Sequence, residues 1–269
     1  MRNLNGNVGT AEITTANLQN GNGSSNGLGG AIGGIRNSRV GIAERNVWST
    51  TYTIAELEEL SNEFEHWDAT EIIKWSLGNF APNICITSSM TDGVLIHLTT
   101  QIYKNIEVVF IDTGYHFPET LETVDLMRRH FGLNLRIMSV PPRSPGEEHW
   151  VLDPKKCCSS VKVGQLDRAL LGKSAWMSGL RRADSPNRAE MPVVAHDVRG
   201  LVKINPIINW SNEDIDNYIA EYEIPFNPLL DRGYPSIGCA PCTIPISPGD
   251  DIRSGRWAGQ DRSECGMHI

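Results

Sequence analysis

No apolar run in this 269-residue chain approaches the roughly 18 to 20 residues that a membrane-spanning helix needs. The N-terminus shows no basic segment followed by an apolar one, so it gives no sign of a secretory signal peptide. Basic residues are fewer than acidic ones, 24 Lys and Arg against 32 Asp and Glu, and the net charge is −8. That charge disfavours non-specific nucleic-acid binding, because a polyphosphate backbone would be repelled. We therefore expect a cytoplasmic protein that binds neither membranes nor nucleic acid.

Six cysteines are present, and in a chain without a secretion signal they are more often reduced, metal-bound or catalytic than joined in disulfides. Four of them form two pairs: the adjacent Cys157 and Cys158, and Cys239 with Cys242 in a Cys-x-x-Cys loop. Cys85 lies in a continuous apolar stretch and is expected in the core. The two pairs predict a metal site made of four thiolates.

Three interpretations of these pairs are open at this point. Neighbouring side chains on a helix diverge by about 100°, so adjacent cysteines poorly share one small tetrahedral ion. An iron–sulfur cluster has irons at separate corners and tolerates that divergence better. A structural zinc ion held by four thiolates is the second interpretation. A redox Cys-x-x-Cys is the third, and it would leave Cys157 and Cys158 without a role.

The last cysteine, Cys265, has neighbours that suit a nucleophile. Arg253 and Arg256 precede it and His268 follows it, and positive side chains near a thiol favour the attacking thiolate. Glycines at positions 259 and 266 border it, which predicts a C-terminal segment that can swing. We therefore predict that Cys265 is catalytic.

The composition divides the chain into two parts. Residues 1–46 are rich in Gly, Asn, Ser and Thr and bury too little apolar surface to fold, so they are predicted to form a disordered tail. Residues 47–269 are predicted to form a single domain. Capping boxes at Thr53 and Ser211, and a capping Asp68, predict three helix starts.

Apolar segments in this domain alternate with helical patterns, which predicts an α/β fold with an open, mostly parallel sheet covered by helices. The predicted strands cover residues 84–87, 108–111, 133–139, 176–178 and 201–204, and two of the intervening helices cover 92–103 and 118–131.

Polar residues and glycines follow three of the predicted strands. They are Ser88 and Ser89 after the first, Asp112, Thr113 and Gly114 after the second, and Gly179, Arg181 and Arg182 after a third. Ligands of open α/β sheets bind at the carboxyl ends of the strands. Hydroxyls and free backbone amides at a helix N-terminus favour an anion there. The sequence therefore predicts a nucleotide site at this edge.

Six motifs, in order, resemble the sulfonucleotide reductases over roughly residues 48 to 269. They are Ile111–Thr120 (IDTGYHFPET), Cys157-Cys158, Gly179–Arg182 (GLRR), Ile237–Thr243 (IGCAPCT), Arg253–Trp257 (RSGRW) and Glu264–His268 (ECGMH). The chain is most like the bacterial assimilatory adenylyl-sulfate (APS) reductases that carry an iron–sulfur cluster.

This resemblance implies a PP-loop adenine-nucleotide fold related to ATP pyrophosphatases, with a 4Fe–4S cluster on the four paired cysteines. It also implies that Cys265 attacks the sulfur of APS, expels AMP and becomes an S-sulfocysteine. Thioredoxin would then release sulfite for cysteine biosynthesis. Because the chain stops at Ile269 without a thioredoxin-like domain, we expect the reductant to be a separate protein.

Such a reaction brings an anionic nucleophile towards an anionic substrate, so positive side chains must offset the repulsion. The candidates are Lys162, Arg253, Arg256 and His268. Lys162 matches a lysine that the family carries four residues after the second adjacent cysteine. Ser159 and Val161, however, stand where the family usually has basic residues. We expect this loss of charge to affect efficiency more than identity.

Other functions are carried alongside this one. Reduction of 3′-phospho-APS (PAPS) is the alternative within the family, but enzymes resembling that branch typically lack the two cysteine pairs. A PP-loop nucleotide-activating enzyme with structural zinc would not need Cys265. A redox-responsive binding module without catalysis is the third. The sequence leaves the oligomeric state open, a homo-oligomer included.

Overall fold

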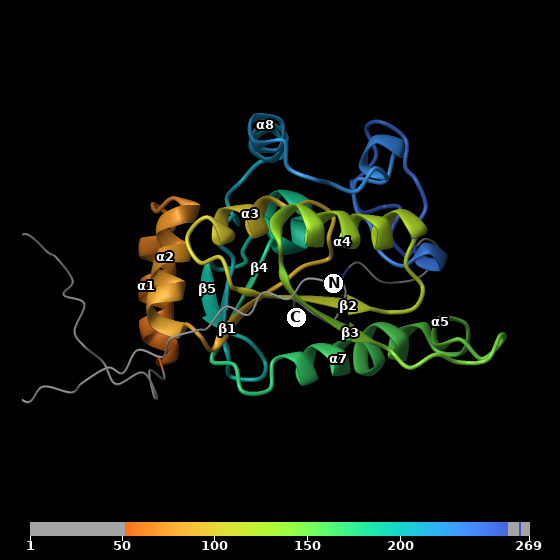
Figure 1. The fold of residues 1–269 in the computed structure, drawn as a ribbon, viewed down its shortest axis with the longest axis horizontal. Coiled ribbons are helices and arrows are strands. Elements are labelled where there is room, and N and C mark those ends of the chain that lie inside the picture. The colour runs from red at the N-terminus through yellow and green to blue at the C-terminus, as the bar shows by residue number, and fades with distance from the viewer. Residues whose placement is uncertain (1–51, 258–263, 265–269) are drawn as a thin grey trace, which may run out of the picture. The chain divides into compact units, whose positions relative to one another are not determined.

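The structure is a computed structural model that describes residues 52–257 and residue 264 (Figure 1). The predicted tail, residues 1–46, lies outside the described residues, and so do Cys265 and His268. The start of the predicted domain at residue 47 lies outside them as well, and the boundary stays a prediction.

A six-stranded sheet forms the centre of the domain, with strand order β3-β2-β1-β4-β6-β5. The strands are β1 (Ile84–Thr87), β2 (Glu107–Asp112), β3 (Asn134–Ser139), β4 (Ala175–Ser178), β5 (Val194–His196) and β6 (Val202–Ile204). All neighbouring pairs are parallel except β5 with β6. The predicted open, mostly parallel sheet is confirmed. The edge strand β5 was not predicted from the sequence.

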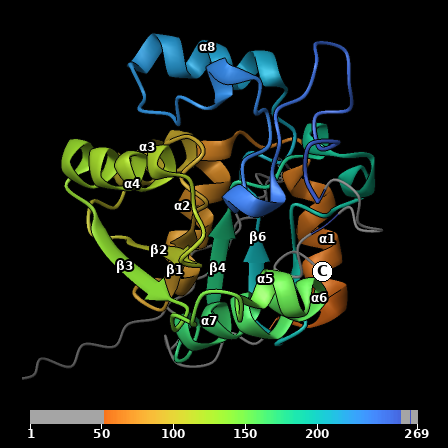
Figure 2. The ribbon, with the colours of Figure 1, turned by 90° about the vertical axis from the view of Figure 1, so that its right-hand side faces the viewer.

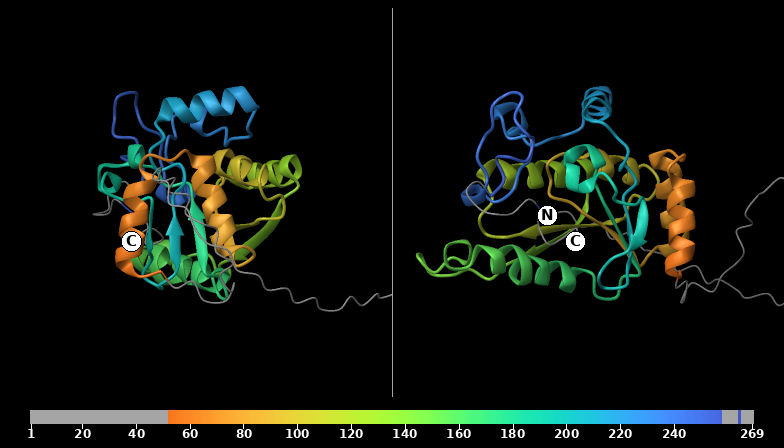
Figure 3. Two further views of the ribbon diagram at one scale, coloured as in Figure 1. Left: turned by 90° about the vertical axis from the view of Figure 1, so that its left-hand side faces the viewer. Right: turned by 180° about the vertical axis from the view of Figure 1, so that it is seen from behind.

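Helices lie on both sides of this sheet (Figure 1). They are α1 (Ile54–Phe64), α2 (Ala69–Phe80), α3 (Val94–Thr100), α4 (Pro118–Phe131), α5 (His149–Leu152), α6 (Pro154–Lys156), α7 (Lys162–Ala169) and α8 (Asn212–Tyr222). The helices α3 and α4 lie on one side of the strands and α7 on the other, and α8 lies beyond α3 and α4 (Figure 1 and Figure 3). Among the helices of the described part, none is long and apolar enough to cross a membrane.

Alternate residues of the strands pack into two separate hydrophobic cores, because successive side chains of a strand point to opposite faces. Ile86 and Phe110 pack with the helices α1 to α4. Cys85 and Val109 point the opposite way and pack with Leu166 on α7. Figure 2 shows α7 across the sheet on the face away from α3 and α4. The expectation that Cys85 is a core residue is confirmed, since it is fully buried.

The three predicted helix starts are confirmed at the level of hydrogen bonds. Thr53, Asp68 and Ser211 each cap a helix, and each forms a reciprocal capping box with the acidic residue three positions later. Such boxes satisfy backbone amides that have no partner inside the helix. Local sequence alone therefore fixes where α1, α2 and α8 begin.

The order of the strands decides where a ligand can bind. From β1 the chain moves outward to β2 and β3, and it then returns to the opposite side of β1 to form β4. The segments that leave β1 and β4 therefore diverge at the carboxyl edge. Crevices between neighbouring strands of this kind are the usual ligand sites of open α/β sheets.

Gly93, at the start of α3, provides a test of how tightly this edge is packed. A Cβ atom on Gly93 would lie 2.9 Å from the Phe131 ring and 3.0 Å from Ile224, whose side chains are both buried. We predict that Gly93→Ala lowers the free energy of unfolding by about 1–3 kcal/mol through overpacking. Urea titration followed by tryptophan fluorescence measures this.

The matched control for that change is Gly78→Ala within α2. A Cβ atom on Gly78 would meet nothing within 4 Å. Alanine is the better helix former, so this variant should gain about 0.5–1 kcal/mol. Equal shifts in both variants would show that Gly93 is not a site of close packing.

Candidate active site

A cavity of about 210 Å³ opens at the carboxyl ends of β1 and β4. Its polar lining comes from four segments that are far apart in the sequence. These side chains and glycines are Ser88, Ser89, Thr91 and Asp92 after β1, Lys162 at the start of α7, Gly179, Arg181, Asp184 and Arg188 after β4, and Ser236, Arg253 and Arg256 near the C-terminus. The sheet edge predicted from the sequence is therefore where the cavity lies.

The loop after β1 is shaped by Met90. This residue has φ of 58°, in a region that side chains with a Cβ seldom adopt, and its side chain is fully buried. The Met90 amide donates a hydrogen bond to the Ser88 hydroxyl at 3.0 Å. Ser89 is left exposed, with its hydroxyl 3.1 Å from that of Thr91. The turn presents hydroxyls to the cavity while Met90 anchors it in the core.

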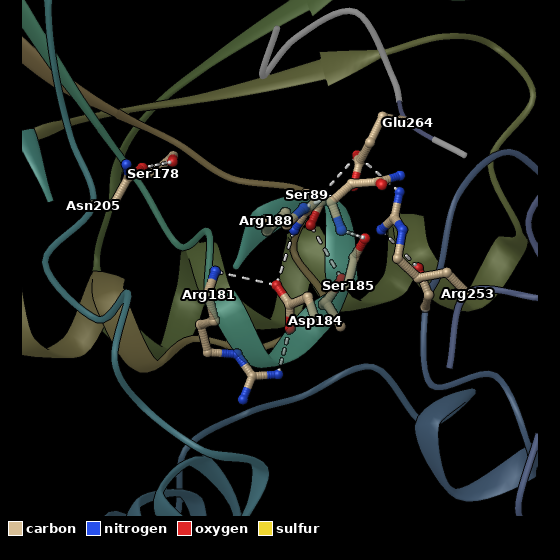
Figure 4. Close-up of polar contacts among 12 residues, drawn as sticks. Ser89, Ser178, Arg181, Asp184, Ser185, Arg188, Asn205, Arg253 and Glu264 are labelled. Carbon is tan, nitrogen blue, oxygen red and sulfur yellow. Dashed lines mark hydrogen bonds and ion pairs between the residues drawn. The ribbon is translucent and has the colours of Figure 1, made fainter. Parts of the chain in front are cut away.

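An alternating chain of charges runs along the cavity (Figure 4). Arg181 contacts Asp184 at 2.7 Å, and Asp184 contacts Arg188 at 2.9 Å. Arg188 then contacts Glu264 at 2.9 Å, and Glu264 contacts Arg253 at 3.1 Å. We call these five residues the charge chain. It holds three guanidinium groups against two carboxylates, so positive charge is in excess.

Burial strengthens the electrostatics of the charge chain. Burial and the nearby charge of Arg188 lower the pKa of Arg253 to about 10. Burial alone would raise the pKa of Glu264, but hydrogen bonds from Arg188 and the charges of Arg188, Arg253 and Arg256 hold it below its usual range. Glu264 is therefore ionised at neutral pH. Desolvated positive charge of this kind favours an anionic ligand.

Arg256 connects the cavity to the Cys-x-x-Cys loop. Its guanidinium donates to the Ile237 carbonyl at 3.1 Å, and a Cβ atom on Gly238 would lie 2.5 Å from it. Only glycine allows this approach to the backbone. The amide of Trp257 donates to the Cys242 carbonyl at 2.9 Å. The cavity arginine and the cysteine loop are thus held together as one unit.

The two cysteine pairs lie near enough to each other for the second pair to influence a thiol of the first. Hydrogen bonding to Cys158, burial, and the neighbouring thiols of Cys158, Cys239 and Cys242 together raise the pKa of the Cys157 thiol. The Cys239 sulfur lies 3.2 Å from the hydroxyl of the buried Thr113. Within the described part of the chain, no three His, Cys, Asp or Glu side chains are gathered tightly enough to hold one metal ion.

The adjacent cysteines lie on an unusual turn. Cys157–Val161 form a π-helix, η1, in which the Lys162 amide donates to the Cys157 carbonyl. A π-turn holds more residues than an α-turn, so successive side chains diverge by less than the α-helical angle. The strain expected for adjacent ligands on an α-helix is therefore reduced. The same turn ends at Lys162, which lines the cavity.

Comparison with known proteins identifies the family. Residues 82–245 match the family model described as the phosphoadenosine phosphosulfate reductase domain. The "Adenosine 5'-phosphosulfate reductase" of Rhodococcus erythropolis is 43% identical over 223 residues, covering 77% of this chain and 90% of the relative. The chain belongs to the sulfonucleotide reductase family. The resemblance to this family noted in the sequence is confirmed.

Solved structures agree with this assignment of the reductase domain. The phosphoadenylyl-sulfate (PAPS) reductase of Candida auris in its phosphate complex superposes with a TM-score of 0.64 at 27% identity, covering 73% of this chain and all of that chain. The FMN adenylyltransferase of Candida glabrata has a TM-score of 0.51 at 12% identity, covering 78% and 85%. The second likeness concerns the fold alone, and it agrees with the predicted PP-loop type of adenine-nucleotide fold.

The reductase cavity contains most of the residues predicted to bind substrate. Those that line it are Ser88, Ser89, Lys162, Gly179, Arg181, Arg253 and Arg256. Asp112, Thr113, Gly114 and Arg182 are not among its lining residues. Asp112 accepts a hydrogen bond from the Gly114 amide at 2.8 Å, which closes the turn after β2. Thr113 faces the cysteines instead of the cavity.

Sequence reasoning missed three residues of the charge chain, Asp184, Arg188 and Glu264. Asp184 and Arg188 lie in short 3₁₀ turns after β4, where no periodic pattern distinguishes them. Glu264 was noted only as part of the C-terminal motif. Their position in the chain could have identified Asp184 and Arg188 as site residues, since both follow β4 at the predicted edge of the sheet.

The sequence predicted that Arg182 binds the nucleotide, whereas in the structure Arg182 is paired with Glu65. Its guanidinium contacts both carboxylate oxygens of Glu65, at 2.8 and 2.6 Å, and also donates to Asn209 and to the Met191 carbonyl. We predict that Arg182→Gln lowers the free energy of unfolding by about 1.5–3 kcal/mol at neutral pH. Arg143→Gln, an exposed arginine in a loop, is the control and should change it little.

The pH dependence gives a second criterion for the same variant. Hydrogen bonds from Arg182 hold the pKa of Glu65 below its usual value of 4.5, despite partial burial. A lowered carboxyl pKa contributes stability above the unfolded value, and this is lost as pH falls through the folded value. The difference between wild type and Arg182→Gln should shrink in urea titrations carried from pH 7 into acid. Unchanged stability with weaker adenine-nucleotide binding would instead make Arg182 a ligand residue.

Proposed function

We propose that this chain reduces adenylyl sulfate to sulfite and AMP, with Cys265 as nucleophile and thioredoxin as the electron donor. The observation that carries this proposal is the arginine-walled cavity at the edge of β1 and β4, joined through Arg256 to two neighbouring cysteine pairs. An anionic nucleotide suits the first feature. A soft metal cofactor suits the second, because thiolates are soft ligands.

The proposed reaction has two steps that balance. The Cys265 thiolate attacks the sulfur of APS, a sulfur–sulfur bond forms, and the bond from sulfur to the phosphate oxygen breaks so that AMP leaves with its electron pair. A thioredoxin thiolate then attacks the Cys265 sulfur and sulfite leaves with the electron pair of the sulfur–sulfur bond. The second thioredoxin thiol resolves the mixed disulfide, so thioredoxin is oxidised.

The described residues can assist the first step through charge. Thiolate and substrate are both anionic, so the attack needs positive groups aimed at the developing AMP phosphate. Lys162, Arg181 and Arg256 line the cavity and are positioned for this role. Ser88 and Ser89 offer hydroxyls in the same cavity, where they can orient the nucleotide. We place the enzyme in the cytoplasm, where thioredoxin is kept reduced.

We propose a 4Fe–4S cluster on Cys157, Cys158, Cys239 and Cys242. The nearness of the two cysteine pairs supports it, and so does the π-turn that eases ligation by adjacent cysteines. When bound, such a cluster supplies a fixed link between the two chain segments and a polarising charge beside the cavity. The Cys157 thiol, whose pKa is raised, would lose its proton on binding iron.

APS is favoured over PAPS as substrate for two reasons. The two cysteine pairs accompany the APS branch that the sequence resembles. The Rhodococcus erythropolis relative, at 43% identity, is named for the APS reaction, whereas the Candida auris enzyme named for PAPS is 27% identical. The PAPS reaction is kept as the alternative.

The cofactor proposal predicts a specific metal content. Protein purified without oxygen should contain about four iron and four sulfide per chain and absorb in the visible range. Cys242→Ala should lose the iron, whereas Cys85→Ala should keep it, because Cys85 lies in the core behind α7. Stoichiometric zinc without iron in active protein would contradict the cluster and support the structural-zinc interpretation.

The nucleophile proposal is tested by covalent labelling. We predict that wild-type protein incubated with ³⁵S-labelled APS, without reductant, gains one sulfonate on the peptide that contains Cys265. Cys265→Ser should bind AMP normally but form neither labelled protein nor sulfite, because serine offers almost no anionic nucleophile at neutral pH. Intact mass and peptide mapping measure both.

Two comparisons sharpen this experiment. Cys85→Ala should label like wild type, because burial raises the pKa of the Cys85 thiol to about 12 and leaves it unreactive. Near-normal turnover by Cys265→Ser would reject the mechanism. When turnover with thioredoxin is measured for both nucleotides, a preference of tenfold or more for PAPS in kcat/KM, about 1.4 kcal/mol, would assign the alternative substrate.

A further inference from the structure

Glu264 is the residue immediately before Cys265, and it is held by two arginines from different segments (Figure 4). Arg188 donates to its carboxylate from Nε at 2.9 Å and from Nη2 at 3.0 Å. Arg253 donates to Oε2 of the same carboxylate at 3.1 Å. Two parallel bonds from one guanidinium fix the orientation of a carboxylate as well as its position.

The contact with Glu264 holds Arg188 in a buried position. Its side chain is only 8% exposed and lies between two carboxylates, Asp184 on one side and Glu264 on the other. Asp184 is in turn bound by Arg181. Removing one partner of a buried ion pair leaves an uncompensated charge, which is strongly unfavourable. Without Glu264, the buried Arg188 would therefore lose one of its two carboxylate partners.

This arrangement leaves other groups for the substrate anion. Lys162 and Arg181 line the cavity, and the partners of Arg181 are Asp184 and the Ser211 carbonyl. A nucleotide can therefore be held by Lys162 and Arg181 while Glu264 stays on Arg188 and Arg253. The geometry thus favours a carboxylate that remains bound during the reaction over one that merely occupies the anion site until substrate arrives.

We propose that Glu264 is a positioning residue that fastens the segment carrying Cys265 to Arg188 and Arg253 at the wall of the cavity. The inference rests on the proposed function, since it assigns the anchor of the proposed nucleophile. One peptide unit separates the two residues, so holding the Glu264 carboxylate restricts where the Cys265 thiol can lie. Misplacement of a reacting group by about 1 Å can cost 100-fold in rate.

The test compares Glu264→Gln, which removes the charge at constant shape, with Glu264→Asp, which keeps the charge on a shorter side chain. We expect Glu264→Gln to slow single-turnover sulfonation of Cys265 by about tenfold or more at saturating APS, with the dissociation constant for AMP within about twofold of wild type. Glu264→Asp should recover part of the rate. Glu122→Gln, an exposed glutamate on α4, removes the same charge elsewhere and should behave as wild type.

Hydrogen–deuterium exchange of the C-terminal peptide in the free enzyme provides a readout that does not need turnover. Exchange should be faster in Glu264→Gln than in wild type and in Glu122→Gln. If the exchange and the sulfonation rate are both unchanged, the anchor is rejected while the proposed function stands. Tighter AMP binding by Glu264→Gln would reject it as well, because Glu264 would then compete with substrate.

Failure of the proposed function is distinguishable from failure of the anchor. If wild-type protein forms no sulfonated cysteine with APS, the proposed function fails, and exchange alone decides the anchor. Faster exchange in Glu264→Gln would then support it and equal exchange would overturn it.

Discussion

The neighbouring parallel strands β1 and β4 determine where the cavity of this reductase domain lies and which segments line it. Because the chain leaves them in opposite directions, their carboxyl ends cannot be covered by a single connecting loop. Segments from four parts of the sequence line the cavity there, and they bring hydroxyls and guanidinium groups to it. The sheet supplies rigid positions, since its central strands are buried on both faces. The chemistry resides in the segments that leave it.

Local features of the sequence predicted the framework well. Capping boxes mark their own helix starts, because the interaction spans three residues and needs no tertiary contact. Helix α3 is shorter than predicted, Val94–Thr100 instead of residues 92–103. Asp92 and Gly93 serve as the turn and the cap before it, and turns follow Thr100. Apolar runs show that a helix exists more clearly than where it ends.

The two arginines Arg182 and Arg188 show where prediction from sequence stops. Both follow β4 and both are bound by carboxylates, so composition cannot separate them. Arg182 pairs with Glu65, which is 117 residues away, and Arg188 pairs with Glu264, which is 76 residues away. Only the folded chain decides which guanidinium faces the cavity. The π-turn at Cys157 and Cys158 was likewise not predicted, because no local pattern in the sequence marks it.

The close approach of the Arg256 guanidinium to the backbone of Gly238 links the state of the cysteines to the cavity. Gly238 directly precedes Cys239, and the Trp257 amide holds the Cys242 carbonyl. A chemical change that displaces the thiol loop, such as oxidation of a cysteine, would also disturb a cationic group of the cavity. Oxidation of the sulfur atoms would therefore weaken recognition of the nucleotide through an arginine that is not itself modified.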